Sequence, residues 1–512
     1  MAGPDDEPAE FSSEELTITV LQEHLQHGEL TSERLVDLYS QRIAALDRQG
    51  PALRAVLETN PSAFDNAAQL DRERRERGPR GPLHGIPILL KDNIDTADAM
   101  GTRAGSLALT GWHPPEDAFV AQRLRAAGAI LLGKLNMSEW ANFRSTSSSS
   151  GWSGVGGQCR NPYALDRSPG GSSSGSGAAA AANFAAACLG TETNGSIVSP
   201  AAACGVVGIK PTVGLTSRRG VIPISASQDS VGPLARTVTD AALVLATIAG
   251  VDPHDQATAH SVGHASNDYR RALTRDGARA VRLGVPRDRF FGYSDKVDAV
   301  INDALRLFQE LGATLVDPTN LPVAATTNSR EAEMAVLLHE FKAGLNAYLA
   351  RVSPDLPVHS LDDLIRFNAD HAAEEMPYFG QELLLKALAV GGLDDPAYLT
   401  AREQNWRASR QEGLDAVMEK HHLDALVLPS SDTPWKIDWI NGDHGRGGGS
   451  GPAARAGYPV ISVPAGFSFG LPVGLLLVGR AFSEQKLIEI AFAFEQAGQA
   501  RRAPQFLPST FP

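Results

Sequence analysis

Two turns rich in glycine and serine lie close together in the stretch from residue 169 to residue 211. The first turn, residues 170–177, leads into an alanine-rich segment, and the second, residues 194–196, leads into another. A serine hydroxyl becomes a nucleophile when a neighbouring base removes its proton. Small side chains also let backbones approach one another closely. The stretch is therefore typical of a buried catalytic centre in which serine hydroxyls do the chemistry.

Each turn also fits a motif with a different meaning. Residues 171–175 match the G-x-S-x-G turn that presents a nucleophilic serine, but that turn needs a strand directly before it, and residues 161–166 have the composition of a turn. Residues 170–177 resemble a flexible linker in composition, although the alanines after them favour a helix. Residues 194–196 match an N-glycosylation site, which requires an exposed loop in a secreted protein.

Taken together, the two turns resemble the hallmark of the amidase signature family. In that family a GGSSGGS-like loop is followed by GTDxGGS, and here residues 190–196 read GTETNGS. The separation of Ser172 and Ser196 matches the family's spacing. Upstream, residues 81–93 (GPLHGIPILLKDN) resemble the family's strand that carries a catalytic lysine. The resemblance extends from about residue 16 to about residue 496.

The resemblance implies a Ser–cis-Ser–Lys relay. Lys91 is the expected base, Ser172 the bridging cis-serine and Ser196 the nucleophile that forms an acyl-enzyme. The backbone N–H groups of four consecutive residues are the expected oxyanion hole: Thr193, Asn194, Gly195 and Ser196.

A lysine base requires an unusual environment. The reference pKa of lysine is near 10.4, so Lys91 can act near neutral pH only if burial or its neighbours favour the neutral form. The apolar residues 88–90 before it are compatible with burial. The alternative is a lysine whose stem packs on the core while its ammonium reaches water. None of the 13 histidines stands in a serine-hydrolase motif, and His84 is expected to be structural.

Within the family, the resemblance is closest to bacterial peptide amidases, which share residues 136–145 and 190–193 and carry Asp where this chain has Asn194. It implies hydrolysis of the C-terminal carboxamides of peptides. One alternative is an amidase of other acyl or aryl amides, or an esterase. Another is the glutamine-hydrolysing subunit of a tRNA-dependent amidotransferase, which would require partner subunits.

Composition limits the other possibilities. The net charge of −13 argues against non-specific binding to nucleic acid or an anionic membrane. The three cysteines imply neither a disulfide framework nor a CxxC metal site, and no nucleotide-binding glycine motif occurs. We therefore expect no metal, no cofactor and no partner beyond a small-molecule or peptide amide substrate, with the protein acting as a monomer or homodimer.

The termini and apolar runs bear on location. The sequence contains no stretch of 18 apolar residues, so it predicts no transmembrane helix. Residues 1–10 are acidic and lack the apolar core of a signal peptide, so a cytoplasmic location is expected, although a secreted protein whose signal had been removed would look the same. Residues 1–11 are expected to be disordered.

The elements that must position these residues alternate between strands and helices. Apolar runs bounded by turn signals predict buried strands, among them one within residues 82–94 and one at residues 423–429, and the alternation predicts a mixed or parallel sheet. The resemblance implies the α/β amidase signature fold, a central mixed β-sheet flanked by helices in α/β/α layers with a helical insertion. We expect one domain over residues 1–512, divided into N-terminal helices (12–77), a catalytic core (78–324), a helical insertion over the site (325–425) and a C-terminal return to the sheet (426–505).

Three further expectations concern the N-terminal helices, a serine-rich segment and the choice of substrate. Residues 12–15 fit a capping box that opens a helix, and another helix is expected after Thr31. Residues 145–157 are compatible with either a mobile loop or an ordered wall of the site. Substrate choice is expected to depend on the insertion, on residues 145–153 and on residues 434–439, whose tryptophans could equally belong to the core.

Overall fold

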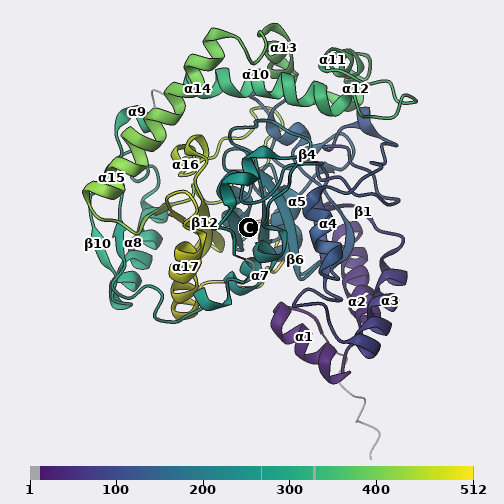
Figure 1. The fold of residues 1–512 in the computed structure, drawn as a ribbon, viewed down its shortest axis with the longest axis horizontal. Coiled ribbons are helices and arrows are strands. Elements are labelled where there is room, and N and C mark those ends of the chain that lie inside the picture. The colour runs from purple at the N-terminus through teal and green to yellow at the C-terminus, as the bar shows by residue number, and fades with distance from the viewer. Residues whose placement is uncertain (1–11, 267, 327–329, 511–512) are drawn as a thin grey trace, which may run out of the picture.

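The computed structural model describes residues 12–266, 268–326 and 330–510. These residues form one 11-stranded sheet in the order β1-β3-β2-β6-β8-β7-β12-β13-β11-β9-β10, seen at the centre of Figure 1. Its strands are β1 (Val56–Thr59), β2 (Pro87–Lys91), β3 (Ile130–Leu135), β6 (Ala187–Glu192), β7 (Val207–Lys210), β8 (Ser230–Ala235), β9 (Arg282–Gly284), β10 (Thr314–Val316), β11 (Ala425–Pro429), β12 (Val460–Ser468) and β13 (Leu471–Val478). A separate hairpin pairs β4 (Trp152–Ser153) with β5 (Gly157–Gln158).

The sheet is mixed, as predicted. Strand β2 runs parallel to both β3 and β6, whereas β6 is antiparallel to β8 and β12 is antiparallel to both β7 and β13. All residues of β2 and β6 are buried, because helices cover the sheet and leave these strands no contact with water. The predicted α/β fold, with helices flanking a mixed sheet, is confirmed.

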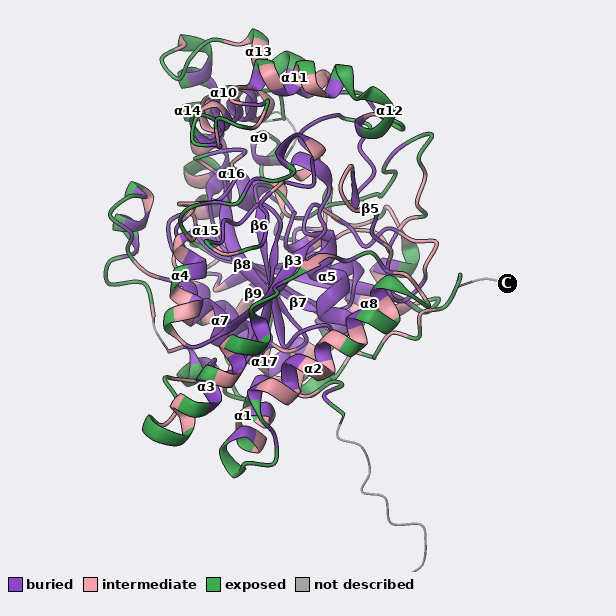
Figure 2. Cartoon of the chain, turned by 90° about the vertical axis from the view of Figure 1, so that its right-hand side faces the viewer, coloured by how far each residue is buried: buried purple, intermediate pink, exposed green. Residues whose placement is uncertain are grey.

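Two groups of helices contact the sheet. Helices α5 and α6 contact each other and the central strands, and a second group contains α4, α7, α8 and α17. Their bounds are α4 (Phe119–Ala126), α5 (Ser174–Ala181), α6 (Val198–Ala203), α7 (Val238–Ile248), α8 (Asp295–Glu310) and α17 (Glu484–Gly498). Figure 2 shows buried residues gathered around the central strands and exposed residues on the outward faces of helices such as α8 and α2.

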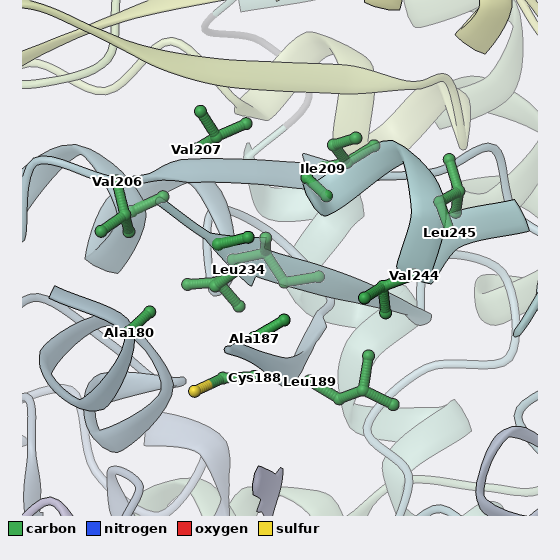
Figure 3. Close-up of a cluster of buried hydrophobic side chains, with 14 of the residues drawn as sticks. Ala180, Ala187, Cys188, Leu189, Val206, Val207, Ile209, Leu234, Val244 and Leu245 are labelled. Atoms are coloured by element: carbon green, nitrogen blue, oxygen red, sulfur yellow. The ribbon is translucent and has the colours of Figure 1, made fainter. Parts of the chain in front are cut away.

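Helix α5 lies deep in the core because its side chains are small. It contains only Ser, Gly and Ala, and all of its residues are buried. In Figure 3, Ala180 of this helix lies near Cys188 of β6 and Leu234 of β8, and Val207 of β7 lies on the far side of Leu234. Cys188, like Cys159 and Cys204, is a free and buried cysteine.

The N-terminal helices are α1 (Ile18–His27), α2 (Ser32–Ile43) and α3 (Ala63–Arg77). The helix predicted after Thr31 is confirmed, and Thr31 caps it by accepting from Arg34 N–H. The prediction of a helix opening at residues 12–15 was wrong, because α1 begins at Ile18 with Thr17 as its N-cap. Glu14 and Glu15 instead form ion pairs with arginines far along the chain. The prediction for residues 1–11 falls outside the described residues.

The segment between β10 and β11 is helical, as predicted, and lies at the top and upper left of Figure 1. Its helices are α9 (Val323–Thr326), α10 (Arg330–Leu349), α11 (Leu361–Asp370), α12 (Ala372–Glu375), α13 (Glu382–Ala389), α14 (Pro396–Ser409) and α15 (Asp415–Lys420), and α16 (Gly451–Ala456) follows β11. Shorter 3₁₀ or π turns are η1 (Ala44–Arg48), η2 (Leu107–Leu109), η3 (Glu139–Asn142), η4 (Gln256–Ser261), η5 (Arg270–Ala272) and η6 (Arg410–Leu414). Across the described residues, no helix has both the length and the apolar character needed to cross a membrane.

Candidate active site

Lys91 ends strand β2 and points into the protein interior. Its side chain is completely buried. The Nζ atom donates a hydrogen bond to Ser172 Oγ at 2.8 Å and another to Thr191 Oγ1 at 2.9 Å. The lysine therefore lies in direct contact with the first of the two predicted serines, and its amine does not reach water.

Burial changes the acid–base chemistry of Lys91. Removal from water lowers the pKa of Lys91 to about 7, although the carboxylates of Asp229 and Glu192 oppose the shift. Desolvation disfavours a charged amine, so a large fraction of Lys91 is neutral near pH 7. A neutral amine with this pKa can accept a proton from a hydroxyl group under physiological conditions.

Ser172 is held by the glycine-rich turn before α5. The Gly171–Ser172 peptide bond is cis, and Ser172 is completely buried. A side chain on Gly171 would place its Cβ 2.5 Å from Ser138 Oγ and 2.7 Å from Ser150 Oγ, so only glycine fits there. The residues before this turn, 159–170, form no strand, which removes the structural context that the G-x-S-x-G interpretation of residues 171–175 required.

Ser196 lies in the second turn, between β6 and α6. Its carbonyl oxygen accepts a hydrogen bond from Ser173 N–H at 3.1 Å, so the two serine-containing turns are in contact. Ser196 is 8% exposed, whereas Ser172 and Lys91 are 0% exposed. The three predicted residues thus range from a partly accessible hydroxyl to a fully buried amine.

Glu192, a residue with no role predicted from the sequence, organises the second turn. Its carboxylate accepts hydrogen bonds from the N–H groups of Gly195 (2.8 Å), Ile197 (2.7 Å) and Val198 (3.0 Å). An acidic side chain at the start of a helix stabilises the free N–H groups and the positive end of the helix dipole. The signal in the sequence was an acidic residue just before the turn that leads into α6.

The four N–H groups expected to form an oxyanion hole differ in their surroundings. Gly195 N–H donates to Glu192, so in this structure it points at a carboxylate rather than at a substrate. Within the described part of the chain, the N–H groups of Asn194 and Ser196 donate to no acceptor. Gly195 has φ +86°, which favours glycine and shapes this part of the turn.

A cavity of about 260 Å³ opens beside the two turns. Gly171, Asn194 and Gly195 line it, and Ser150 and Trp435 contribute to its walls. Trp435 therefore lies at the cavity and not in the core.

Asp443 joins two walls of this cavity. It accepts hydrogen bonds from Ser150 N–H at 3.0 Å and from Trp435 Nε1 at 2.9 Å. Ser148, Ser149 and Ser150 are buried, which favours an ordered wall over a mobile loop for this part of residues 145–157. Asp443 was not predicted from the sequence, because nothing in its local pattern indicates a contact with Ser150, which is 293 positions away.

His84 has a structural role, as expected. It is completely buried. One ring nitrogen lies 3.0 Å from Leu70 O, and the other accepts from Arg80 N–H at 3.3 Å.

Across the described residues, no group of three or more His, Cys, Asp or Glu side chains is placed to hold a metal ion.

Comparison with known proteins identifies similar chains. A family model described as "Amidase" matches residues 34–488. A probable amidase from Arabidopsis thaliana is 43% identical, covering 97% of this chain and 93% of its own length. The crystal structure of the native peptide amidase from Stenotrophomonas maltophilia is 52% identical, with a TM-score of 0.92, covering 96% of this chain and 99% of that one. A glutamyl-tRNA(Gln) amidotransferase subunit of Moorella thermoacetica is 38% identical, covering 96% of this chain and 98% of its own length.

Proposed function

The chain belongs to the amidase family, as a hydrolase acting on amide C–N bonds, and we propose that it is a peptide amidase, which converts a peptide with a C-terminal carboxamide and water into the peptide acid and ammonia. The observation that carries the chemistry is the 2.8 Å contact between Ser172 and a buried Lys91 whose pKa is lowered to about 7. The similarity to a solved peptide amidase over nearly the whole chain supports the substrate.

The proposed reaction begins with a proton relay. Neutral Lys91 accepts the proton of Ser172 Oγ while Ser172 Oγ accepts the proton of Ser196 Oγ. Ser196 Oγ forms a bond to the carbonyl carbon, and the carbonyl oxygen becomes an oxyanion. Backbone N–H groups directed at that oxygen lower the barrier, and the proposed donors are those of Thr193, Asn194 and Ser196.

The second half of the reaction releases both products. The proton returns through Ser172 to the leaving nitrogen, the C–N bond breaks, and ammonia departs from an acyl-enzyme on Ser196. Water then attacks the acyl carbon while Lys91 and Ser172 accept its proton. The peptide acid leaves, and Ser196 regains its hydroxyl hydrogen.

The segment between residues 325 and 425 is proposed to contribute to substrate choice. Its helix α10 supplies Glu333, which contacts Asn194 at the edge of the cavity. Residues 145–153 and 434–439 contribute Ser150 and Trp435 to the same cavity. These contacts support the proposed division of the chain, in which a helical insertion covers a catalytic core.

Ammonia release from a blocked dipeptide amide tests this function, with glutamine and an aryl amide assayed in parallel. We expect release from the dipeptide amide by the native chain and by Ser12→Ala, a matched change at an exposed serine, and none by Ser196→Ala. Activity on the aryl amide alone would keep the relay and reject the peptide substrate. Substantial turnover by folded Ser196→Ala would reject the nucleophile.

The enzyme is further proposed to act in the cytoplasm without partner subunits, as a monomer or homodimer. The glutamine-hydrolysing alternative, favoured by the 38% identity to an amidotransferase subunit, would require such subunits. Light scattering of the purified chain measures its mass, and activity on glutamine that appears only with copurifying proteins would support the alternative.

A further inference from the structure

Glu333 of α10 is a buried carboxylate that reaches the turn before Ser196. Its Oε1 atom accepts a hydrogen bond from Asn194 Nδ2 at 2.7 Å and one from Gln228 Nε2 at 3.2 Å. Its Oε2 atom accepts from the guanidinium of Arg455 at 2.9 Å. One side chain thus receives donors from three segments that are remote in sequence.

The other end of Asn194 is also held by the protein. Ser450, the residue before α16, donates its hydroxyl hydrogen to Asn194 Oδ1 at 2.8 Å. Gln228 Nε2 reaches the carbonyl oxygen of Thr193 at 3.3 Å. The side chain of Asn194 and the backbone next to it are therefore fixed between the insertion and the C-terminal part of the chain.

The anchor on Glu333 is rigid because it is an ion pair shielded from water. Glu333 is 8% exposed and Arg455 is 4% exposed. The guanidinium of Arg455 donates in addition to Ala325 O at 2.6 Å. A buried, hydrogen-bonded pair of this kind holds its geometry, since separating the two charges leaves one of them without compensation.

The backbone beside Asn194 needs such support. The N–H groups of Thr193, Asn194 and Ser196 donate to no acceptor in the described structure of this turn, and an oxyanion donor works only when it lies about 2.7–3.1 Å from the developing charge. We propose that Glu333 is a positioning residue that acts through Asn194 to hold the turn of residues 193–196 in its oxyanion-binding geometry. The proposal rests on the proposed amide hydrolysis at Ser196, and it assigns Glu333 no contact with the substrate.

Asn194 offers a clear way to test this role, because it is exposed to the cavity. If the Asn194 side chain bound the substrate through Oδ1, Asn194→Asp would keep its activity, because aspartate also presents an acceptor oxygen. In the proposed role the donor Nδ2 matters, because only an N–H group can bond to the Glu333 carboxylate. Asn194→Asp keeps an acceptor for Ser450 and loses the donor, placing two carboxylates against each other.

The experiment compares Glu333→Gln, Asn194→Ala, Asn194→Asp and the double variant Glu333→Gln/Asn194→Ala in the full chain. Glu331→Gln is the matched control, because Glu331 is exposed on the same helix. The readouts are kcat and KM on an amide substrate, the rate of Ser196 sulfonylation by phenylmethanesulfonyl fluoride, and the melting temperature. Sulfonylation needs no amide, so it reports on the turn even if the peptide substrate is wrong.

We expect kcat and the sulfonylation rate to fall by up to about 10²-fold in each of the three single variants at Glu333 and Asn194, since small misplacements of catalytic groups cost this much. KM should change little, and Glu331→Gln should match the native chain. Glu333→Gln removes the ion pair with Arg455 that anchors the connection to Asn194, and Asn194→Ala removes that connection itself. The double variant should therefore be no slower than the slower single one.

Three results would overturn the proposal. These are native kcat in Asn194→Asp, a raised KM with native kcat in the single variants, or effects that multiply in the double variant. If Glu333→Gln does not fold, the comparison of Asn194→Ala with Asn194→Asp decides the question. Normal sulfonylation by a native chain that releases no ammonia from any amide would instead reject the proposed function.

Discussion

Lys91 shows how much of the proposed chemistry depends on the surroundings of one side chain. Its amine has no exposure to solvent, and its hydrogen-bond partners are the hydroxyl oxygens of Ser172 and Thr191 and the carbonyl oxygen of Thr191. These neutral acceptors do not compensate a positive charge as a carboxylate in contact would. The lowered pKa of Lys91 is therefore a consequence of where strand β2 ends.

The pH dependence of activity should report this pKa. Because burial lowers the pKa of Lys91 to about 7, the base is protonated and inactive below that pH and neutral above it. We expect kcat/KM at pH 5 to be about 100-fold below its value at pH 9, with one proton lost between them. Initial rates across this range measure the profile, with circular dichroism at each pH as the control for folding. A flat profile from pH 5 to 9 would contradict a lysine base.

Lys91 should also affect stability with a predictable sign. Its folded pKa, about 7, lies below the ordinary lysine value of 10.5, so the unfolded chain binds more protons between these pH values and the folded state gains stability as pH rises. We expect Lys91→Met to be inactive. Between pH 7 and pH 9 its free energy of unfolding should rise by about 2 kcal/mol less than that of the native chain. Urea unfolding at the two pH values measures the difference, and equal gains would show that the lysine is not buried in solution.

At the scale of elements, a buried arginine joins the helical segment to the wall of the site. The guanidinium of Arg144 donates to Glu139 Oε1 and to the carbonyl oxygen of Glu375 at the end of α12, both at 2.5 Å. It also lies 4.2 Å from the ring centroid of Phe379. The side chains of Arg144, Glu139 and Glu375 are completely buried, so Arg144 is a buried link between η3 and α12.

Removing that cation should destabilise the fold. Arg144→Met leaves Glu139 and Glu375 buried without a counter-charge, and we expect a loss of about 3–5 kcal/mol in the free energy of unfolding. Arg366→Met on α11 is the matched control, because Arg366 pairs with Asp362 and Asp363 at the surface and such pairs contribute about 0–1 kcal/mol. Chemical denaturation measures both, and similar losses would contradict the assigned burial of the Arg144 cluster.

At the scale of the whole molecule, segments that are distant in the sequence meet through polar contacts. Asp240 of α7 accepts a hydrogen bond from Ile18 N–H, at the start of α1, at 2.9 Å. Arg501 near the C-terminus pairs with Glu15. The N-terminal helices are thereby connected both to the helices on the sheet and to the C-terminal segment.

The contact at Asp240 predicts a pH-dependent stability. Burial raises the pKa of Asp240 to about 6, so the folded state holds a proton that the unfolded chain has already lost, and stability falls as pH rises toward 6. Asp240→Asn keeps the acceptor for Ile18 and cannot ionise. Between pH 5 and pH 7.5, we expect the free energy of unfolding of the native chain to fall by about 1 kcal/mol more than that of this variant. Urea unfolding at the two pH values measures both losses. Equal losses in the native chain and in Asp240→Asn would show that the Asp240 carboxyl group is in contact with water.

Local patterns in the sequence were enough to predict many elements and the candidate residues. Apolar runs bounded by turn signals indicated β2 and β11, and the threonine before α2 indicated where that helix begins. The same kind of evidence misplaced the start of α1, because residues 12–15 satisfy a capping pattern while their carboxylates are drawn to Arg42 and Arg501. Capping patterns are local, and those ion pairs are not.

The sequence by itself determined the family and the α/β fold with a mixed sheet, and it supplied the candidate site residues, because the motifs that carry the family resemblance are each short and can be recognised without the structure. Only the tertiary structure decided that Lys91 reaches Ser172 and loses its contact with water, that Gly195 N–H bonds to Glu192, and that Glu333 holds Asn194. A pKa and a hydrogen-bond partner depend on which atoms surround a group in space. For Lys91 and Asn194, strands and helices far away in the sequence supply those atoms.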